Sequence, residues 1–429
     1  MIHVLQVLPT LHVCGGVENY LMNYYRHIDT SAVKFTFAVH APADPVFATL
    51  IAERGDEVVV LPPFTIRNFP RIKREIDALF ETRTFDIVHC HQANAAWFYF
   101  KSAKKHGITH RVLHSHQAAA ADKWTHKLRN YPLLAFGKRY TTDPAACSRL
   151  AGDWLWGKRA YQVINNAVDP DAFIFDAHER ESVRREFEIP EDAFVVGHIG
   201  RFCPQKNQEY LLRIFGELLK LEPKAHLLLV GGGEDLESCK KTAAEMGIAH
   251  HVSFPGVRTD TARMYAAMDV FVMPSLYEGL PVVGVEAQAA GLPLVLADTI
   301  TEETRILDTT AFLPLSAGPA AWAERILTYR DHVRTDTRAE IAAAHFDIRQ
   351  ESAALVSFYR RLLESTPAGK ENTPAEKDPT SEKQVPASEE KVPASEEQVP
   401  ASEEKVPVSE KQAPASEEKT SAPADTEQA

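Results

Sequence analysis

Apolar runs alternate with amphipathic stretches along most of this chain, a pattern typical of repeated βαβ units on a parallel sheet. Residues 2–8 form the first apolar run and predict a strand. Residues 17–28 carry apolar side chains at a period of about 3.6, which predicts a helix. Further strands are predicted in a first series, at 35–39, 57–61, 86–90, 111–115 and 142–146. A second series is predicted at 194–200, 226–230, 252–254, 270–273 and 294–297.

Residues 163–173, with the sequence VINNAVDPDAF, separate the two series. This segment is rich in Asn, Asp and Pro and lacks a hydrophobic period, which is typical of a hinge. We therefore expect an α/β protein with two doubly wound domains of similar size around a cleft, at 1–170 and 171–345. An amphipathic stretch at 348–363 predicts a last helix, within a segment 346–364 that follows the second domain.

The character of the chain changes from about Asn372 onward. Proline returns every seventh residue in near-copies of VPASEEK, within a tail at 370–429. A period of seven also suits a coiled coil, but a proline in each repeat excludes a continuous helix. Low hydrophobicity and the lack of aromatic residues cannot offset the entropy of ordering, so we expect this tail to be disordered. A solvated tail without a catalytic role is favoured over a spacer or an interaction arm.

The bulk composition limits the classes of function. With 429 residues and 45% hydrophobic residues, the chain is long enough for two globular domains. Its formal net charge of −12 argues against general nucleic-acid binding. The five cysteines are scattered without a CxxC pair, which favours a reduced, cytoplasmic setting. We find neither a signal peptide nor an apolar run of about 18 residues, so we expect a soluble protein or one bound to a membrane from one side.

Two carboxylates lie close together in the segment MPSLYEGLPVVGVEAQAAGLP, at 273–293. The run before it predicts a buried strand, and 282–290 predict a helix. Glu278 then lies on the loop between the strand and the helix, and Glu286 in the first turns of the helix. Both would face the crevice at the carboxyl end of a parallel strand, where open α/β sheets bind ligands. Carboxylates beside the free N–H groups of a helix start suit a ligand with many hydroxyls, such as a sugar nucleotide.

Two loops have the composition of phosphate-binding sites. Gly15 and Gly16 stand between the first strand and its helix, where a close backbone approach and free N–H donors suit a diphosphate. An ordinary tight βα turn explains the same glycines, and this alternative stays open. Arg201 and Lys206 flank a second loop, so both can reach phosphate oxygens, although a pair of solvated surface cations remains the alternative.

Histidines provide a rival interpretation. His89 and His91, like His114 and His116, form HxH pairs at the carboxyl ends of two strands, so both members of each pair face one side. Such pairs can bind a metal ion, but no nearby cluster of Asp, Glu or Cys completes a ligand set. We therefore expect no metal site. His116 is interpreted as a hydrogen-bond donor in the cleft, and His89 and His114 as satisfied packing residues.

These motifs together resemble glycosyltransferase family 4, the retaining transferases with two Rossmann-like domains known as the GT-B fold. The resemblance covers about residues 1–364, in the order GGVE, HSH, GRFCPQKN, GVRTD and EGLPVVGVE. The segments ACSRLAGDWLWG, VINNAVD and GHIGRFCPQKNQEYLL are most similar to bacterial capsular and exopolysaccharide transferases. One departure is GGVE in place of the commoner GGAE, which puts the acceptor side in doubt.

The resemblance implies a role for each motif residue. Glu286 would bind the nucleotide ribose and Glu278 the hydroxyls of the donor sugar, with His116 near the anomeric carbon. Arg201 and Lys206 would hold the diphosphate, assisted by the backbone at the GGVE motif. We take the catalytic residues to be His116, Glu278, Arg201 and Lys206. The donor site would also include Gly15, Gly16, Val257, Gly279, Leu280, Val282 and Glu286.

The implied reaction is departure of a nucleoside diphosphate, with UDP as the expected nucleotide, from an anomeric carbon. Cations and helix N-termini aimed at the developing charge stabilise the transition state. The family implies no cofactor and no divalent metal, because Arg201 and Lys206 take its place. It also implies retention of configuration by attack from the front face, with a leaving phosphate oxygen assisting deprotonation of the acceptor.

The acceptor and the location follow from weaker signals. Residues 123–140 mix aromatic and leucine side chains with six basic residues, a blend that could bind an anionic membrane and reach a lipid-linked acceptor. A pair of surface helices with solvated charges is the alternative. We expect a cytoplasmic protein, with peripheral contact at the inner face of the membrane. Rival functions are a sugar-nucleotide epimerase of the same fold, a non-catalytic nucleotide-sugar sensor and a metal hydrolase built on the HxH pairs.

Overall fold

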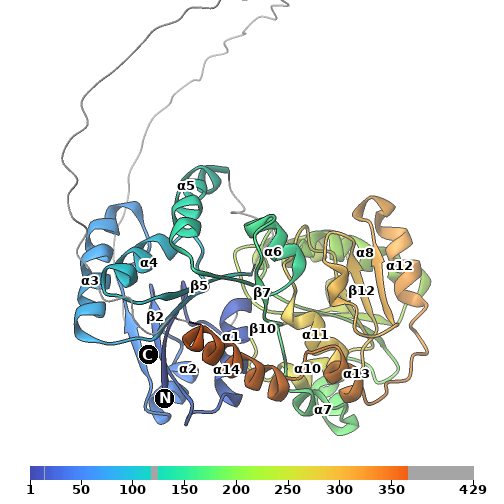
Figure 1. Cartoon of the computed structure of the whole chain (residues 1–429). Coiled ribbons are helices and arrows are strands. Elements are labelled where there is room, and N and C mark those ends of the chain that lie inside the picture. Colours follow the sequence, from blue (N-terminus) through green and yellow to red (C-terminus); the bar gives the residue numbers. More distant parts are fainter. Residues whose placement is uncertain (14, 117–123, 366–429) are drawn as a thin grey trace, which may run out of the picture. The chain divides into compact units, whose positions relative to one another are not determined.

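The structure, a computed structural model, describes residues 1–13, 15–116 and 124–365 (Figure 1). The contacts along the chain divide it at residue 369 into two units, and all described residues lie in the first unit, which is compact. Every described helix and strand lies in the first unit. The proline-rich repeats predicted to be disordered lie outside the described residues.

A seven-stranded parallel sheet forms the N-terminal half of this unit, in the order β3-β2-β1-β4-β5-β6-β7. Its strands are β1 Ile2–Val7, β2 Val33–Val39, β3 Glu57–Val60, β4 Ile87–Cys90, β5 His110–Ser115, β6 Asp143–Ala146 and β7 Gln162–Val163. Its helices are α1 Gly16–His27, α2 Pro45–Glu53, η1 Ile66–Asn68, α3 Phe69–Thr82, α4 Ala96–Lys105, α5 Trp124–Tyr140 and α6 Arg149–Trp156. Strands β4 and β5 are buried along their whole length, as expected for the inside of a parallel sheet.

A six-stranded parallel sheet forms the C-terminal half, in the order β10-β9-β8-β11-β12-β13. Its strands are β8 Phe194–Ile199, β9 Ala225–Val230, β10 Val252–Gly256, β11 Val270–Met273, β12 Leu294–Ala297 and β13 Thr310–Leu313. The helices are η2 Pro170–Phe173, α7 Ala177–Glu186, α8 Gln208–Leu221, α9 Leu236–Glu245, η3 Ala249–His251, α10 Thr261–Ala267, α11 Val282–Ala289, η4 Glu302–Thr304, η5 Leu315–Ala317, α12 Gly318–Leu327, α13 Arg338–Ala343 and α14 Ile348–Glu364.

The two sheets share one topology. In each, the first strand in sequence lies between the second and the fourth, so β2 and β4 flank β1, and β9 and β11 flank β8. Strand order reverses at this point, and open α/β sheets bind ligands outside the carboxyl ends of the strands there. The predicted class, two doubly wound Rossmann-like α/β domains, is confirmed by these two sheets.

The last helix, α14, returns to the N-terminal half, and Figure 1 shows it in orange beside α1. An isolated parallel β-bridge between Val168 and Asp347 holds the segment just before α14 in place. Tyr20 of α1 and Tyr359 of α14 belong to one buried cluster, which also takes in Val285 of α11. Helix α14 thus completes the N-terminal core, and both halves contribute to it.

Every predicted strand is present, with its ends shifted by at most two residues, but β7 and β13 have no counterpart in the prediction. Strand β7 has only two residues and β13 is half buried, so neither gives a clear hydrophobic pattern. Within 123–140 the described residues form one helix, α5, and the alternative of a helix pair is wrong. In the described part of the chain, every helix is too short or too polar to cross a bilayer.

Candidate functional site

Two neighbouring strands of the second sheet end in loops that bring a cation and a carboxylate together. Lys206, after β8, donates from Nζ to Oε1 of Glu278, after β11, at 2.7 Å. The two side chains are only 16% and 9% exposed. Gln205 ties the loops together, because its backbone oxygen accepts from Leu276 at 2.8 Å and its amide donates to the oxygen of Tyr277 at 2.9 Å. The sequence predicted both charged residues, and the structure places them in direct contact.

The loop that carries Lys206 has a fixed backbone. Asn207, just before α8, adopts the left-handed conformation with φ of 57°, which Asn tolerates better than other residues with a Cβ. Its side-chain amide donates to the backbone oxygen of Pro274 at 3.0 Å. This bond joins the loop after β8 to the end of β11. Lys206 is therefore positioned by backbone geometry as well as by its ion pair.

Glu286 lies on α11, the helix that follows the loop of Glu278. Its Oε2 accepts a hydrogen bond from the hydroxyl of Tyr265 at 2.9 Å. Burial raises the pKa of Glu286 to about 7, although the bond from Tyr265 lowers it. This carboxyl therefore changes its charge near neutral pH. Its contact with a ribose stays a prediction.

The loop between β1 and α1 contains the GGVE motif. A Cβ on Gly15 would lie 2.0 Å from Oε2 of Glu18, so glycine leaves room for that carboxylate. A Cβ on Gly16 would meet no atom within 4 Å. Burial raises the pKa of Glu18, while a hydrogen bond from Thr10 and the positive charge of Arg201 lower it. Arg201 is thus close enough to the N-terminal loop for its charge to act on Glu18.

The backbone of His116, in the N-terminal half, lies against the loop of the C-terminal half that carries Glu278. A Cβ on Gly279 would lie 2.3 Å from the backbone oxygen of His116, so only glycine fits there. Ser148 donates from its hydroxyl to the oxygen of Gly279 at 3.2 Å, and Asn166 donates from its side chain to the oxygen of Leu280. The N-terminal half therefore holds the loop that carries Glu278.

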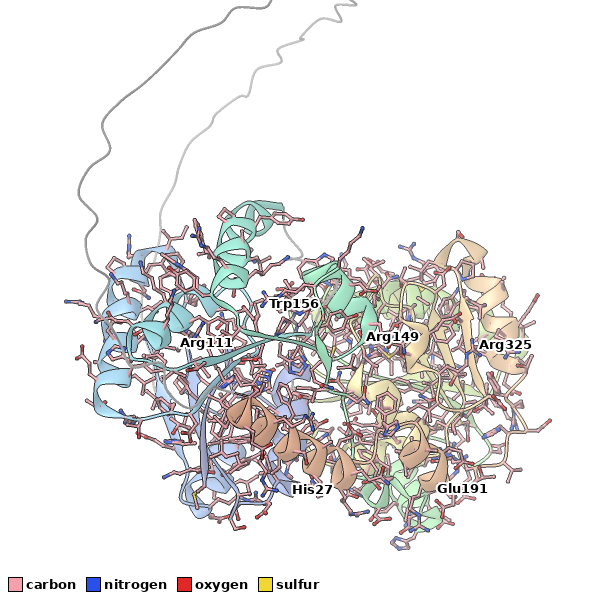
Figure 2. All side chains as sticks on the ribbon, viewed as in Figure 1. His27, Arg111, Arg149, Trp156, Glu191 and Arg325 are labelled. Atoms are coloured by element: carbon pink, nitrogen blue, oxygen red, sulfur yellow. The ribbon has the colours of Figure 1, made fainter. Side chains whose placement is uncertain are left out.

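A further contact between the halves lies nearby. The backbone N–H of Arg149, which begins α6 and is labelled in Figure 2, donates to Oε2 of Glu303 at 2.6 Å. The guanidinium of Arg149 is 82% exposed and lies 3.7 Å from the same carboxylate. This exposed pair adds little stability by itself, but it fixes the orientation of η4 toward α6.

The remaining predicted donor-site residues differ in exposure. Leu280 and Val282 are buried, with 4% and 7% of their surface exposed, and belong to the core that both halves share. Val257 is 49% exposed and lies just after β10, beside Gly232. Contacts of Leu280, Val282 and Val257 with the donor stay predictions.

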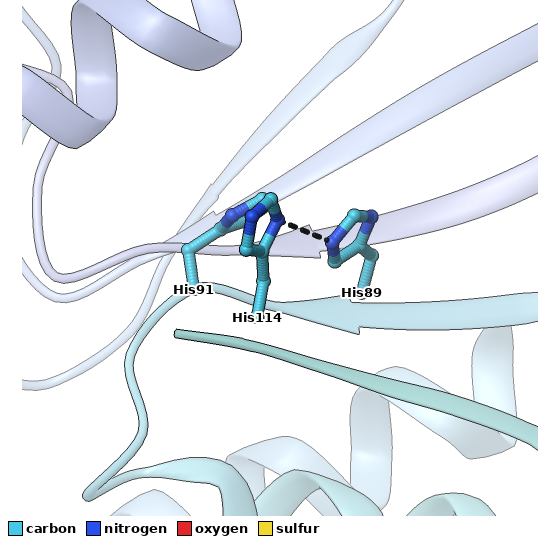
Figure 3. A group of neighbouring side chains, drawn as sticks. All are labelled: His89, His91 and His114. Atoms are coloured by element: carbon cyan, nitrogen blue, oxygen red, sulfur yellow. Dashed lines mark hydrogen bonds between the residues drawn. The ribbon is translucent and has the colours of Figure 1, made fainter. Parts of the chain in front are cut away.

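Four histidines form a cluster on one face of the first sheet: His89, His91 and His114, which are buried and drawn in Figure 3, and His116, which is partly exposed. His89 and His114 lie 3.2 Å apart between Nε2 and Nδ1. His91 and His116 lie 2.9 Å apart between Nδ1 and Nε2. Tyr20 of α1 packs against this cluster, with its ring 4.9 Å from that of His116. The expectation that both members of each HxH pair face one side is met.

The cluster is also close enough to hold a metal ion. The ligand atoms of His89, His91 and His114 all lie within 4.8 Å of one another. Each ring nitrogen of His89 and His91 already has a hydrogen-bond partner in the protein. His114 differs from expectation, because its Nε2 has no partner among the described residues. Hydrogen bonding within the protein accounts for the cluster, and the absence of a metal stays a prediction.

Several polar residues of the site were not predicted. They act through backbone oxygens or across long sequence separations: Gln6, Glu18, Ser148, Asn166, Gln205 and Tyr359. Gln6 stands in an apolar strand run and Tyr359 in an amphipathic helix, where neither position differs from its neighbours. The other four had a local signal, because they stand inside the GGVE, ACSRLAGDWLWG, VINNAVD and GRFCPQKN motifs.

The comparisons with known proteins agree with this architecture. Residues 14–172 match the family described as Glycosyltransferase Family 4, and residues 179–327 match Glycosyl transferases group 1. The chain is 30% identical to the putative glycosyltransferase EpsF of Bacillus subtilis, over 83% of this chain and 96% of that protein. It is 27% identical to a D-inositol 3-phosphate glycosyltransferase of Mycobacterium leprae, over 85% and 92% of the two chains.

Solved structures show the same fold. Anabaena Alr3699/HepE in complex with UDP-glucose has a TM-score of 0.66 at 18% identity, over 85% of this chain and 99% of that one. Sucrose-phosphate synthase of Thermosynechococcus elongatus has a TM-score of 0.70 at 18% identity, over 85% and 100%. The two sheets and these matches define a glycosyltransferase of the GT-B type. Within that class the chain belongs to glycosyltransferase family 4.

Proposed function

We propose that this enzyme is a retaining glycosyltransferase that moves a sugar from a UDP-sugar to a lipid-linked or saccharide acceptor in bacterial capsule or exopolysaccharide synthesis. The observation that carries the proposal is the contact of Lys206 with Glu278 at 2.7 Å, on two loops at the carboxyl end of the second sheet. It supplies a cation for a diphosphate and a carboxylate for sugar hydroxyls. UDP is supported by the UDP-glucose bound to HepE, and the polymer by the resemblance to capsular transferases.

In the proposed reaction, the bond between the anomeric carbon and the diphosphate oxygen breaks, and its electron pair leaves with the diphosphate. Lys206, Arg201 and the N–H groups at Gly16 stabilise the charge that develops there. The acceptor hydroxyl attacks the same face, and its proton passes to the leaving phosphate oxygen. Configuration at the anomeric carbon is thereby retained.

The ion pair prepares the site for this charge. In the free enzyme Lys206 and Glu278 neutralise each other, so neither charge is buried alone. When the donor binds, Lys206 turns to a phosphate oxygen and Glu278 accepts from a sugar hydroxyl. Each residue exchanges one partner for another, and little of the binding energy is lost to desolvation.

The same reasoning makes the reaction independent of divalent metal, because the positive charge comes from Arg201, Lys206 and a helix start. We expect activity to survive dialysis against a strong chelator. A loss that added Mg²⁺ or Mn²⁺ restores would contradict this part of the proposal.

The function is tested by supplying a panel of nucleotide sugars and measuring nucleotide release with and without membrane-lipid acceptors. Acceptor-dependent release from a UDP-sugar, with a glycosylated lipid or saccharide found by mass spectrometry, supports the proposal. Interconversion of the donor sugar without release would identify an epimerase. Tight donor binding without turnover on any acceptor would identify a sensor.

We further propose that α5 contacts the inner face of the cell membrane. Tyr131 and Phe136 on this helix are 58% and 50% exposed, and Lys138 and Arg139 follow them. Exposed aromatic rings beside cations suit an anionic bilayer surface. This contact would bring a lipid-linked acceptor to the N-terminal half.

The prediction for α5 is that replacing Tyr131 and Phe136 by serine lowers pelleting with anionic liposomes about tenfold, while activity on a water-soluble acceptor stays. A matched control replaces Leu221 and Val333, also exposed but distant from α5, by serine. Equal losses in both double variants, or pelleting that does not depend on anionic lipid, would rule out α5 as the contact.

A further inference from the structure

A chain of hydrogen bonds connects helix α14 to His116. The hydroxyl of Tyr359 lies 2.7 Å from Nδ1 of His89, and Nε2 of Gln6 donates to this hydroxyl at 3.1 Å. Oε1 of Gln6 lies 2.9 Å from Nε2 of His91, whose Nδ1 lies 2.9 Å from Nε2 of His116. All of these side chains are buried except that of His116, which is partly exposed. This hydrogen-bond network therefore ends at the predicted donor site.

The direction of one bond in this chain fixes the next. Gln6 donates to Tyr359 with its amide nitrogen, so its carbonyl oxygen faces His91. An amide oxygen only accepts, and His91 must therefore carry its proton on Nε2. A neutral imidazole has one N–H, so Nδ1 of His91 accepts, and His116 donates to it from Nε2. Nδ1 of His116 is then unprotonated.

The same logic holds on the other branch. The Tyr359 hydroxyl accepts from Gln6 and passes its own proton toward Nδ1 of His89. His89 then donates from Nε2 to Nδ1 of His114, the bond drawn in Figure 3. Reversing the amide of Gln6 would reverse every bond on both branches. The orientation of this one amide, which Tyr359 couples to His89, therefore decides the protonation of the whole cluster.

Burial keeps the histidine rings uncharged, so the rings can differ only in which nitrogen carries the proton. It lowers the pKa of His89 and of His116 to about 3, and that of His91 well below its ordinary value. A second proton on His89 or His91 would also place two donors opposite each other in one bond. At neutral pH each ring thus carries one proton.

We propose that Gln6 and Tyr359 are positioning residues that hold His116 in one tautomer, with its proton on Nε2 and Nδ1 free to accept from a hydroxyl of the donor sugar. The role of the acceptor rests on the proposed function, in which His116 contacts that sugar. A site built to accept from a hydroxyl discriminates against a sugar that has a carboxylate or a hydrogen at the contacted position. The network thereby selects donor sugars that carry a hydroxyl at the contacted position.

A metal ion at His89, His91 and His114 is the competing interpretation. A metal ion would have to coordinate ring nitrogens that already take part in the hydrogen-bond network. Metal binding and the proposed tautomer therefore exclude each other. The hydrogen bonds at both ring nitrogens of His89 and of His91 favour the network.

The test reads the tautomer of His116 directly, in the full-length protein labelled with ¹⁵N-histidine and with no donor present. Long-range ¹H–¹⁵N spectra at pH 7 distinguish a protonated ring nitrogen from an unprotonated one, and the variant His116→Gln assigns the signals. The proposal requires Nε2–H in the wild-type protein. It also requires a mixture of both tautomers in Tyr359→Phe, because Gln6 then loses the hydrogen bond that couples its amide to His89.

The matched control is Tyr24→Phe, which removes another buried hydroxyl, one that donates to the oxygen of Asn165 at 2.7 Å outside the network. It should leave the tautomer of His116 and the activity unchanged. Tyr359→Phe should lower kcat/KM for the donor about two- to tenfold beyond this control, the value of one neutral hydrogen bond. Tyr359→Phe should also lose part of its preference for a UDP-hexose over the matching UDP-uronic acid.

Three results would overturn the proposal: Nδ1–H or an imidazolium at His116 in the wild type, an unchanged tautomer in folded Tyr359→Phe, or a stoichiometric metal ion in the purified protein. The wild-type spectrum alone shows which tautomer His116 adopts. The proposal can therefore be refuted even if Tyr359→Phe fails to fold. Because the spectra need no substrate, a protein that transfers no sugar but shows Nε2–H would refute the function and not the network.

Discussion

The two halves of this enzyme present opposite kinds of polar chemistry to the same site. The N-terminal half offers buried, neutral histidines that bond to one another, to Gln6 and to Tyr359. The C-terminal half offers full charges, with Lys206 against Glu278 on loops between adjacent strands. Both halves have the same sheet topology, so the difference lies in the loops and strand ends and not in the fold.

This difference matches two tasks. A diphosphate leaving group develops charge during the reaction, and cations stabilise it more in the transition state than in the ground state. The hydroxyls of the sugar stay uncharged and distinguish it from other sugars, and oriented neutral donors and acceptors are best suited to bind them. We therefore expect substitutions in the C-terminal half to affect turnover, and those in the N-terminal half to affect donor choice.

The largest effect is expected for Lys206→Met, which removes the cation and leaves Glu278 buried without its partner. We expect kcat to fall about 10²–10³-fold, the usual loss for one transition-state electrostatic contact. The free energy of unfolding should also fall by about 3 kcal/mol, because a buried carboxylate has lost its ion pair. Turnover at saturating donor and urea denaturation measure the two effects.

A second substitution separates these two consequences of losing Lys206. Glu278→Gln in the Lys206→Met background removes the unpaired charge and should restore most of the stability. It should restore none of the turnover, because the cation is still missing. Recovery of both quantities together would mean that Lys206 acts only as a structural partner of Glu278.

A smaller effect is expected at the N-terminal loop, for Gly16→Ala. A Cβ there meets no atom within 4 Å, and alanine is a good helix former, so thermal stability should not fall. If the diphosphate approaches this backbone, the methyl group blocks it, and KM for the donor should rise about tenfold, equivalent to about 1.4 kcal/mol. An unchanged KM in a stable variant would show that the diphosphate does not bind next to the backbone of Gly16.

The sequence predicted the fold and the charged half of the site better than the neutral half. Alternating apolar runs identified the two sheets, and the spacing of Glu278 and Glu286 placed one on a loop and one in α11. These are local signals, readable within about twenty residues. The network around His116 depends on Tyr359, which is 270 residues from His89 in the chain, and on one amide in an apolar strand. Such long-range pairing has no local signature.

The last effect, of about the same size as that of Gly16→Ala, concerns pH and compares the two halves directly. Burial raises the pKa of Glu286 to about 7, while His116, with a pKa of about 3, stays neutral at every pH above 6. If a ribose hydroxyl donates to the ionised Glu286, donor affinity should rise about tenfold between pH 6 and pH 8, following the ionised fraction. Glu286→Gln should bind more weakly at pH 8 and show no such dependence.

Protein stability should change with pH in the opposite sense. Because the folded pKa of Glu286 lies above the ordinary value of 4.5, the neutral carboxyl contributes stability below pH 4.5, and this contribution is lost as the pH rises to 7. Wild type should therefore lose stability relative to Glu286→Gln between pH 5 and pH 7, in urea titrations at matched ionic strength. If the free energy of unfolding changed equally with pH in both proteins, the group that titrates near pH 7 would not be Glu286. The predicted contrast between the two halves would then be wrong.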